Sequence, residues 1–176
     1  MPHALNRELP ENIALIEGDA RVTYAELDRR VLSMAAGLLA GEADLQEARV
    51  AFLIPASVDY VTVLHGIWRA GGIAIPLNVA ATQPEWEHCL ISAGVTRVIT
   101  TSDHRDSIQG LCDRLAIPLG QVGEFEVDGS VLLPELTPDR RAMIVFTSGT
   151  TSKPKGAVTT HGNIAAQITT LIDAWA

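Results

Sequence analysis

The feature that most constrains the fold is a regular alternation of short apolar runs with longer helix-like segments between residues 50 and 116. Each apolar run is too short for a typical helix and almost free of charge, which predicts a buried strand. The runs are VAFLIP (50–55), GIAIPLN (72–78) and TRVITT (96–101). Strands that alternate with helices in this rhythm predict an α/β fold, with a mostly parallel sheet flanked by helices.

Local start signals support the helices between and after these strands. Ser57 is suited to cap the first helix, and Pro84 fits the first turn of the second. Asp103 is suited to cap the third, which we expect to end near Leu115. The three predicted helices are 58–71, 83–94 and 103–115.

A further helix is predicted close to the start of the chain. The apolar run 13–16 is followed by GDA (18–20), which is typical of a hairpin turn. Thr23 is a favourable N-cap, and Glu26 three positions later completes the pattern of a capping box. Apolar residues then recur at helical spacing, and the helix is expected to stop near Gly41.

Composition changes along the chain divide it into four parts. Residues 117–138 are rich in glycine, proline and acidic residues, which predicts a short strand pair and a connecting loop. The four parts are a loose leader (1–12), strand–helix units (13–116), this irregular segment (117–138), and a loop-bearing hairpin followed by a helix (139–176).

Charge and cysteine content exclude some classes of partner and compartment. The net charge of -8 argues against nucleic acid, because phosphate backbones are bound by an excess of Lys and Arg. Cys89 and Cys112 lie in apolar, helix-like segments without metal-ligand spacing, which predicts buried free thiols. No secretory signal and no apolar run of membrane-spanning length is recognisable, so a cytoplasmic location is expected.

A hydroxyl-rich segment, FTSGTTSKPKG (146–156), follows the apolar run RAMIVF (141–146) and leads into a predicted short strand, GAVTTH (156–161). Gly149 and Gly156 permit sharp turns and a close backbone approach to a ligand. Successive backbone N–H groups in such a turn form an anion site, to which hydroxyls and lysines add donors and positive charge. The composition therefore predicts a loop that holds a polyphosphate.

This segment differs from the common nucleotide-binding loop, which has the pattern G-x-x-x-x-G-K-[ST]. Counting from Gly149, the sixth position is Pro154, and Gly156 follows Lys155 instead of preceding it. The plain alternative to a phosphate site is a solvated Ser/Thr turn with incidental lysines.

The stretch TSGTTSKPKGAV resembles the signature of the acyl-adenylate-forming enzymes, which reads approximately [ST]-S-G-T-T-G-x-P-K-G. VTYAELDRRV and GIWRAGGIAIPLN resemble two earlier elements of that family, in the same order. The resemblance covers about Ile13 to Trp175, and the tail is most similar to acyl-CoA synthetases of the malonyl-CoA synthetase group. Ser152 departs from the family, which usually has glycine there; a left-handed backbone at this serine would cost about 1–2 kcal/mol.

The resemblance implies part of the N-terminal domain of an ATP-dependent acid–CoA ligase. Such enzymes use ATP and Mg²⁺ to convert a carboxylic acid to an acyl-adenylate with release of pyrophosphate, and coenzyme A then takes the acyl group as a thioester. Lys153 stands at a variable position of the motif and is expected to be a solvated charge. The implied contacts to the ATP phosphates are Thr147, Ser148, Gly149, Thr150, Thr151 and Lys155.

The resemblance also implies that the adenine site, the Mg²⁺-linked glutamate, the catalytic lysine and the C-terminal domain lie downstream. No catalytic residue and no metal ligand is therefore predicted within these residues, and the fragment alone is expected to be inactive. The apolar pattern of the last helix continues to the final residue, and its uncovered face predicts a homo-oligomer. Two alternatives stay open: an adenylation domain that loads a carrier protein, and a non-catalytic α/β binding module.

The remaining polar candidates are predicted to have structural roles. The two histidines His65 and His88 are expected to be helix residues whose hydrogen bonds are satisfied. Trp68 and Arg69 are expected to serve packing and surface roles. Asn78 is expected to be a turn or strand-end residue, and His161 to begin a helix.

Overall fold

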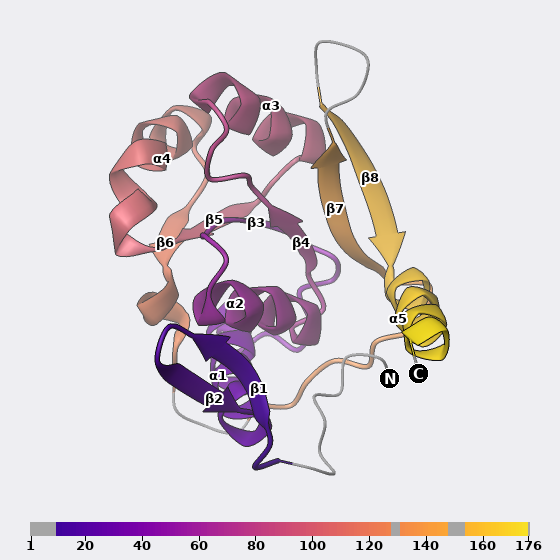
Figure 1. Cartoon of the computed structure of the whole chain (residues 1–176). Coiled ribbons are helices and arrows are strands. Elements are labelled where there is room, and N and C mark those ends of the chain that lie inside the picture. Colours follow the sequence, from indigo (N-terminus) through magenta and orange to yellow (C-terminus); the bar gives the residue numbers. More distant parts are fainter. Residues whose placement is uncertain (1–9, 128–130, 148–153, 176) are drawn as a thin grey trace.

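The computed structural model describes residues 10–127, 131–147 and 154–175. Within these ranges, six strands form one sheet with helices against both of its faces, and a separate two-stranded hairpin lies beside the first two helices (Figure 1). The predicted α/β class with a mostly parallel sheet is confirmed.

The strands follow the predicted order along the chain. The small hairpin consists of β1 (Ile13–Glu17) and β2 (Ala20–Thr23), and the sheet of β3 (Arg49–Leu53), β4 (Ile73–Pro76), β5 (Arg97–Thr100), β6 (Leu119–Gln121), β7 (Arg141–Thr147) and β8 (Lys155–Thr160). In space the sheet order is β6-β5-β3-β4-β7-β8. All neighbouring pairs are parallel except β7 and β8, which are antiparallel, so β8 occupies one edge.

The helices lie between and after these strands. They are α1 (Tyr24–Leu39), α2 (Val58–Arg69), α3 (Gln83–Ala93), α4 (Ser102–Leu115), the 3-10 helix η1 (Val122–Phe125) and α5 (His161–Trp175). In Figure 1, α1 and α2 cover one face of the sheet, α3 and α4 cover the other, and α5 lies at the far end of β8.

Alternate side chains of β3 supply the two halves of the core. Val50 and Phe52 pack with α1 and α2 in one cluster, while Ala51 and Leu53 pack with α3 and α4 in the other. Successive side chains of a strand point to opposite faces, so a strand covered on both sides must be apolar at every position. This requirement explains the continuous apolar run from which the strand was predicted.

The predicted starts of the first two long helices are confirmed at atomic detail. Thr23 Oγ1 accepts a hydrogen bond from the Glu26 backbone N–H at 3.2 Å, and Ser57 Oγ accepts one from Tyr60 N–H at 3.2 Å. The reciprocal half of the expected capping box is not formed, because the Glu26 carboxylate accepts from Arg30 instead. One turn along a helix is the spacing at which such an ion pair forms.

One expected helix start was displaced by two residues, whereas the expected stop of α1 near Gly41 is confirmed. The N-cap of α4 is Thr101, not Asp103, and Asp103 lies in the first turn, where its charge favours the helix dipole. Helix α1 ends at Leu39, and Ala40 takes the left-handed conformation (φ 48°) before Gly41 does (φ 94°).

The prediction of a strand pair within residues 117–138 was wrong. In the part that the structure describes, β6 pairs in parallel with β5, through Val98 with Leu119 and Ile99 with Gly120, and the chain then forms η1. The partner of the strand therefore lies about twenty residues earlier and not in the same segment. Local composition does not reveal such a distant partner.

Both cysteines lie within the described ranges, and both are buried and free, as predicted. Burial among apolar side chains raises the pKa of the Cys112 thiol to about 11 and also raises that of Cys89. These thiols are therefore protonated and act as small apolar core groups. Among the helices that the structure describes, none has the length and apolar character needed to cross a membrane.

Candidate functional site

The hydroxyl-rich segment is carried by the β7–β8 hairpin. Thr147 is the last residue of β7 and stands opposite Lys155, the first residue of β8, and both are exposed. The ladder therefore brings two of the predicted phosphate contacts together at one end of the hairpin. The other four, Ser148, Gly149, Thr150 and Thr151, lie outside the described residues, as do Ser152 and Lys153.

This end of the hairpin lies at the carboxyl edge of the parallel strands. Since β7 runs parallel to β4, and β4 parallel to β3, the segments that follow all three strands emerge on the same side. Open α/β sheets bind ligands at this edge, outside the carboxyl ends of their strands. The fold therefore places Thr147 and Lys155 where a ligand site is expected.

A cavity of about 490 Å³ opens at the same edge. Its walls come from the segments after β3 and β4, from the carboxyl-terminal part of β7 and from α3. Residues that represent these walls are Ile54, Leu77, Phe146, Pro154 and Trp86. Because Phe146 and Pro154 flank the hydroxyl-rich segment, the cavity adjoins the predicted phosphate loop.

The polar groups of the cavity are few, and most already have partners. The Trp86 indole donates to the Asn78 carbonyl at 2.9 Å, and the Asn78 side chain accepts from the Ala80 backbone N–H at 2.9 Å. Asn78 is therefore a turn residue, as predicted. Burial raises the pKa of the Tyr60 phenol, which keeps this group neutral. The cavity walls therefore present few polar side chains without an internal partner.

The opposite end of β7 is fixed by ion pairs. Arg140, just before the strand, makes two hydrogen bonds to the Asp44 carboxylate, at 2.7 and 2.8 Å, and a third to the Gly71 carbonyl at 2.8 Å. The next residue, Arg141, pairs with Glu47. Hydrogen bonds from these guanidinium groups lower the pKa of Asp44 and of Glu47. The strand is therefore anchored at its amino end.

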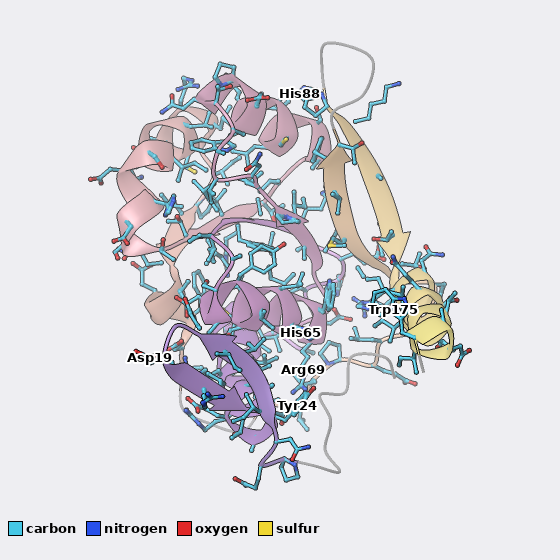
Figure 2. All side chains as sticks on the ribbon, viewed as in Figure 1. Asp19, Tyr24, His65, Arg69, His88 and Trp175 are labelled. Atoms are coloured by element: carbon cyan, nitrogen blue, oxygen red, sulfur yellow. The ribbon has the colours of Figure 1, made fainter. Side chains whose placement is uncertain are left out.

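His88 of α3 contacts the hairpin, and the sequence reasoning did not predict this contact. Its Nε2 lies 2.9 Å from the carbonyl oxygen of Pro154, and its ring meets that of Phe146 edge-to-face, with centroids 6.2 Å apart. Figure 2 shows the His88 side chain between α3 and the hairpin. The contact joins residues 66 positions apart, and no local pattern signals it.

Two residues on α2 also differ from expectation. Arg69 is not at the surface: it is 7% exposed and pairs with Asp28 of α1. The hydrogen bonds of His65 are not all satisfied, since its Nδ1 is buried and has no hydrogen-bond partner among the described residues. Desolvation and the neighbouring Arg69 charge lower the pKa of His65 to about 4. His161 does begin a helix, α5, and is buried there.

The sequence predicts no metal ligand in this chain. Within residues 10–127, 131–147 and 154–175, no three His, Cys, Asp or Glu side chains gather closely enough to hold a metal ion. At this edge of the sheet, the described residues offer the Thr147 hydroxyl and the Lys155 ammonium group as hydrogen-bond donors.

Comparison with known proteins yields one family and many relatives. The family model described as "AMP-binding enzyme" matches residues 3–176. The chain is 34% identical over 177 residues to the mitochondrial malonate–CoA ligase of Mus musculus, covering 94% of this chain and 30% of the relative. It is also 34% identical over 160 residues to a feruloyl-CoA synthase of Amycolatopsis sp, covering 90% of this chain and 32% of the relative.

A solved structure agrees with these matches. The crystal structure of ATP-bound MatB from Rhodopseudomonas palustris superposes with a TM-score of 0.84 at 28% identity, over 94% of this chain and 35% of that chain. The present chain therefore spans about one third of the length of the proteins that it matches.

Proposed function

The chain belongs to the AMP-binding enzyme family, and from this premise we propose that it is the N-terminal part of an ATP-dependent acid–CoA ligase. The parent enzyme converts a carboxylic acid to an acyl-adenylate with release of pyrophosphate, and then transfers the acyl group to coenzyme A. Relatives named for a malonate–CoA ligase and a feruloyl-CoA synthase support this reaction class. Because they match at the same identity, the proposed substrate is a carboxylic acid without further specification.

The observation that carries the proposal is the position of the β7–β8 hairpin. Thr147 and Lys155 face each other across the ladder at the carboxyl edge of the sheet, next to the cavity of about 490 Å³. A phosphate chain at Lys155 would place the rest of a ligand within reach of this cavity. The proposed phosphate contacts are Thr147, Ser148, Gly149, Thr150, Thr151 and Lys155.

The chemical task of these residues is to stabilise negative charge. When a carboxylate attacks the α-phosphate, charge accumulates on the departing pyrophosphate. Hydroxyl and backbone donors already aimed at that position lower the barrier, because they need not reorganise during the reaction. The Lys155 ammonium group adds a mobile point charge that can follow the phosphate as it leaves.

The further partners of the parent follow from the same proposal. Mg²⁺ would neutralise part of the phosphate charge when bound with ATP, and the described residues offer no cluster of three metal ligands of their own. Coenzyme A would supply the thiol acceptor. The two free thiols support a reducing compartment such as the cytoplasm. Exposed apolar residues of α5 support a homo-oligomer.

MgATP binding by the complete parent enzyme tests the proposed site, because the family resemblance places the adenine site downstream of these residues. Isothermal titration with MgATP should show that Lys155→Ala weakens binding roughly ten- to hundredfold, as expected for the loss of a charged hydrogen bond. The matched control Lys153→Ala should stay within about threefold of the wild type, since a solvated charge contributes little. Equal effects of the two substitutions would contradict the assignment of Lys155.

Activity measurements test the proposed reaction. Pyrophosphate release should depend on an added carboxylic acid in the product of the complete reading frame. It should be absent in the 176-residue chain, which spans about one third of its relatives. Substantial acid-dependent release by this chain alone would show that the missing part is dispensable, and would overturn that half of the proposal.

A further inference from the structure

His88 joins α3 to both strands of the loop-bearing hairpin. It hydrogen-bonds the carbonyl of Pro154, which directly precedes Lys155, and its ring packs on Phe146, which directly precedes Thr147. One side chain therefore contacts the residues next to both described phosphate contacts. No role follows for this histidine from the family match or from the sequence motif.

The hydrogen bonds define how the imidazole works. A carbonyl oxygen can only accept, so Nε2 must carry the proton that it shares with Pro154. Ser92, one turn further along α3, lies with its hydroxyl 3.2 Å from His88 Nδ1 and can donate to that nitrogen when the ring is neutral. The serine thus orients the ring and favours the tautomer that donates to Pro154.

The hairpin needs such a connection because β8 is poorly supported elsewhere. It is an edge strand with β7 as its neighbour in the sheet, and its residues from Lys155 to Val158 are exposed. By contrast, α3 is fixed in the core through Trp86, Cys89 and Leu90. The bond from His88 therefore connects the residue before an exposed edge strand to a helix that is packed on the core.

We propose that His88 is a positioning residue that holds Lys155 in the position required to bind the phosphates of ATP. This inference rests on the proposed function. His88 acts through the Pro154 carbonyl and need not touch the nucleotide itself. Without the bond, the start of β8 and the Lys155 backbone gain freedom, and part of the ATP binding energy is spent on ordering them.

The decisive variants are His88→Ala, His88→Gln and the control His104→Ala. The glutamine side chain keeps an N–H donor that can reach the Pro154 carbonyl, whereas alanine keeps none. His104 is a comparable histidine on α4, where it hydrogen-bonds Thr101, away from the hairpin. Binding of MgATP is measured by isothermal titration, together with the thermal unfolding temperature of each variant.

We expect His88→Ala to weaken MgATP binding roughly tenfold, the equivalent of one lost hydrogen bond. His88→Gln should restore binding to within about threefold of the wild type, and His104→Ala should bind as the wild type does. Recovery by glutamine distinguishes positioning through a donated hydrogen bond from simple packing against Phe146, which the amide does not reproduce.

The outcomes separate the two proposals. If Lys155→Ala weakens ATP binding but His88→Ala does not, the role of His88 is wrong and the proposed site stands. If His88→Ala and His88→Gln weaken binding equally, the histidine contributes packing and not a hydrogen bond, which also overturns the inference. If the complete wild-type enzyme does not bind MgATP, the proposed ATP site is wrong and the inference fails with it.

Discussion

A central strand and an edge strand of the sheet place the same residue type in different surroundings. Val50 on β3 is 2% exposed, whereas Val158 on β8 is 53% exposed. The first strand lies between pairs of helices, while the second forms the edge, with α5 continuing from it (Figure 1). Helix α5 has the same contrast within itself, since His161 at its start is buried and Trp175 at its end is 83% exposed.

The chain therefore combines a core buried beneath α1 to α4 with an exposed apolar surface on α5. Exposed apolar patches of this kind mark contact sites for other protein surfaces. The large apolar side chains of α5 that are at least 40% exposed are Ile168, Leu171, Ile172 and Trp175.

Removal of a large apolar side chain should lower the free energy of unfolding strongly in the core and only slightly on α5. Phe52→Ala removes a fully buried ring from the first core cluster and should lower the free energy of unfolding by about 3–5 kcal/mol. Leu171→Ala, on α5, should change it by less than about 0.5 kcal/mol. Urea denaturation followed by circular dichroism measures both, and similar losses would show that α5 is as well packed as β3.

Acid should destabilise the core side through His65. Its pKa is about 4 in the folded chain against 6.5 for the free side chain, so the unfolded chain binds the proton more readily. The contribution is complete above pH 6.5 and is lost as the pH falls, reaching a loss of about 3 kcal/mol near pH 4.

The variant His65→Gln isolates this effect, because the carboxylates that form ion pairs titrate equally in both proteins. The difference in free energy of unfolding between wild type and variant should change by about 3 kcal/mol from pH 7 to pH 4. A difference that is constant over this range would show that His65 is not a buried neutral group. Urea denaturation at a series of pH values provides the measurement.

Self-association should depend on α5 and not on the core. Ile172→Asp places a charge on the exposed apolar face and should weaken association of the chain at least tenfold, by about the value of one buried apolar side chain. The free energy of unfolding of the dissociated protein should stay within about 0.5 kcal/mol of the wild type. Sedimentation equilibrium over a dilution series gives the association constant.

The matched control for this change is Ile91→Asp, since Ile91 lies on α3 and is also 60% exposed, but apart from α5. This variant should associate as the wild type does. If both substitutions leave association unchanged, or if the wild type is a monomer at every concentration, the proposed homo-oligomer is wrong.

Much of the fold could be predicted because the sequence encodes it locally. The apolar runs of β3, β4 and β5 indicated buried strands, and Thr23 and Ser57 provided cap signals that the structure confirms. The pairing of β6 could not be predicted, because its partner β5 is distant in the sequence and the segment itself has a loop-like composition. The N-cap of α4 is Thr101 instead of the predicted Asp103, because threonine and aspartate are both acceptable N-cap residues.

The candidate site shows the same division. The sequence predicted which residues would bind a polyphosphate, because the run of hydroxyls, glycines and lysines resembles a family signature. The folded structure was needed to place Thr147 and Lys155 next to the cavity. It was also needed to show that Arg69 is buried against Asp28, and that His88 reaches Pro154. The physical reason is that these contacts join residues 41 to 66 positions apart, and such contacts depend on how strands and helices pack and not on local propensity.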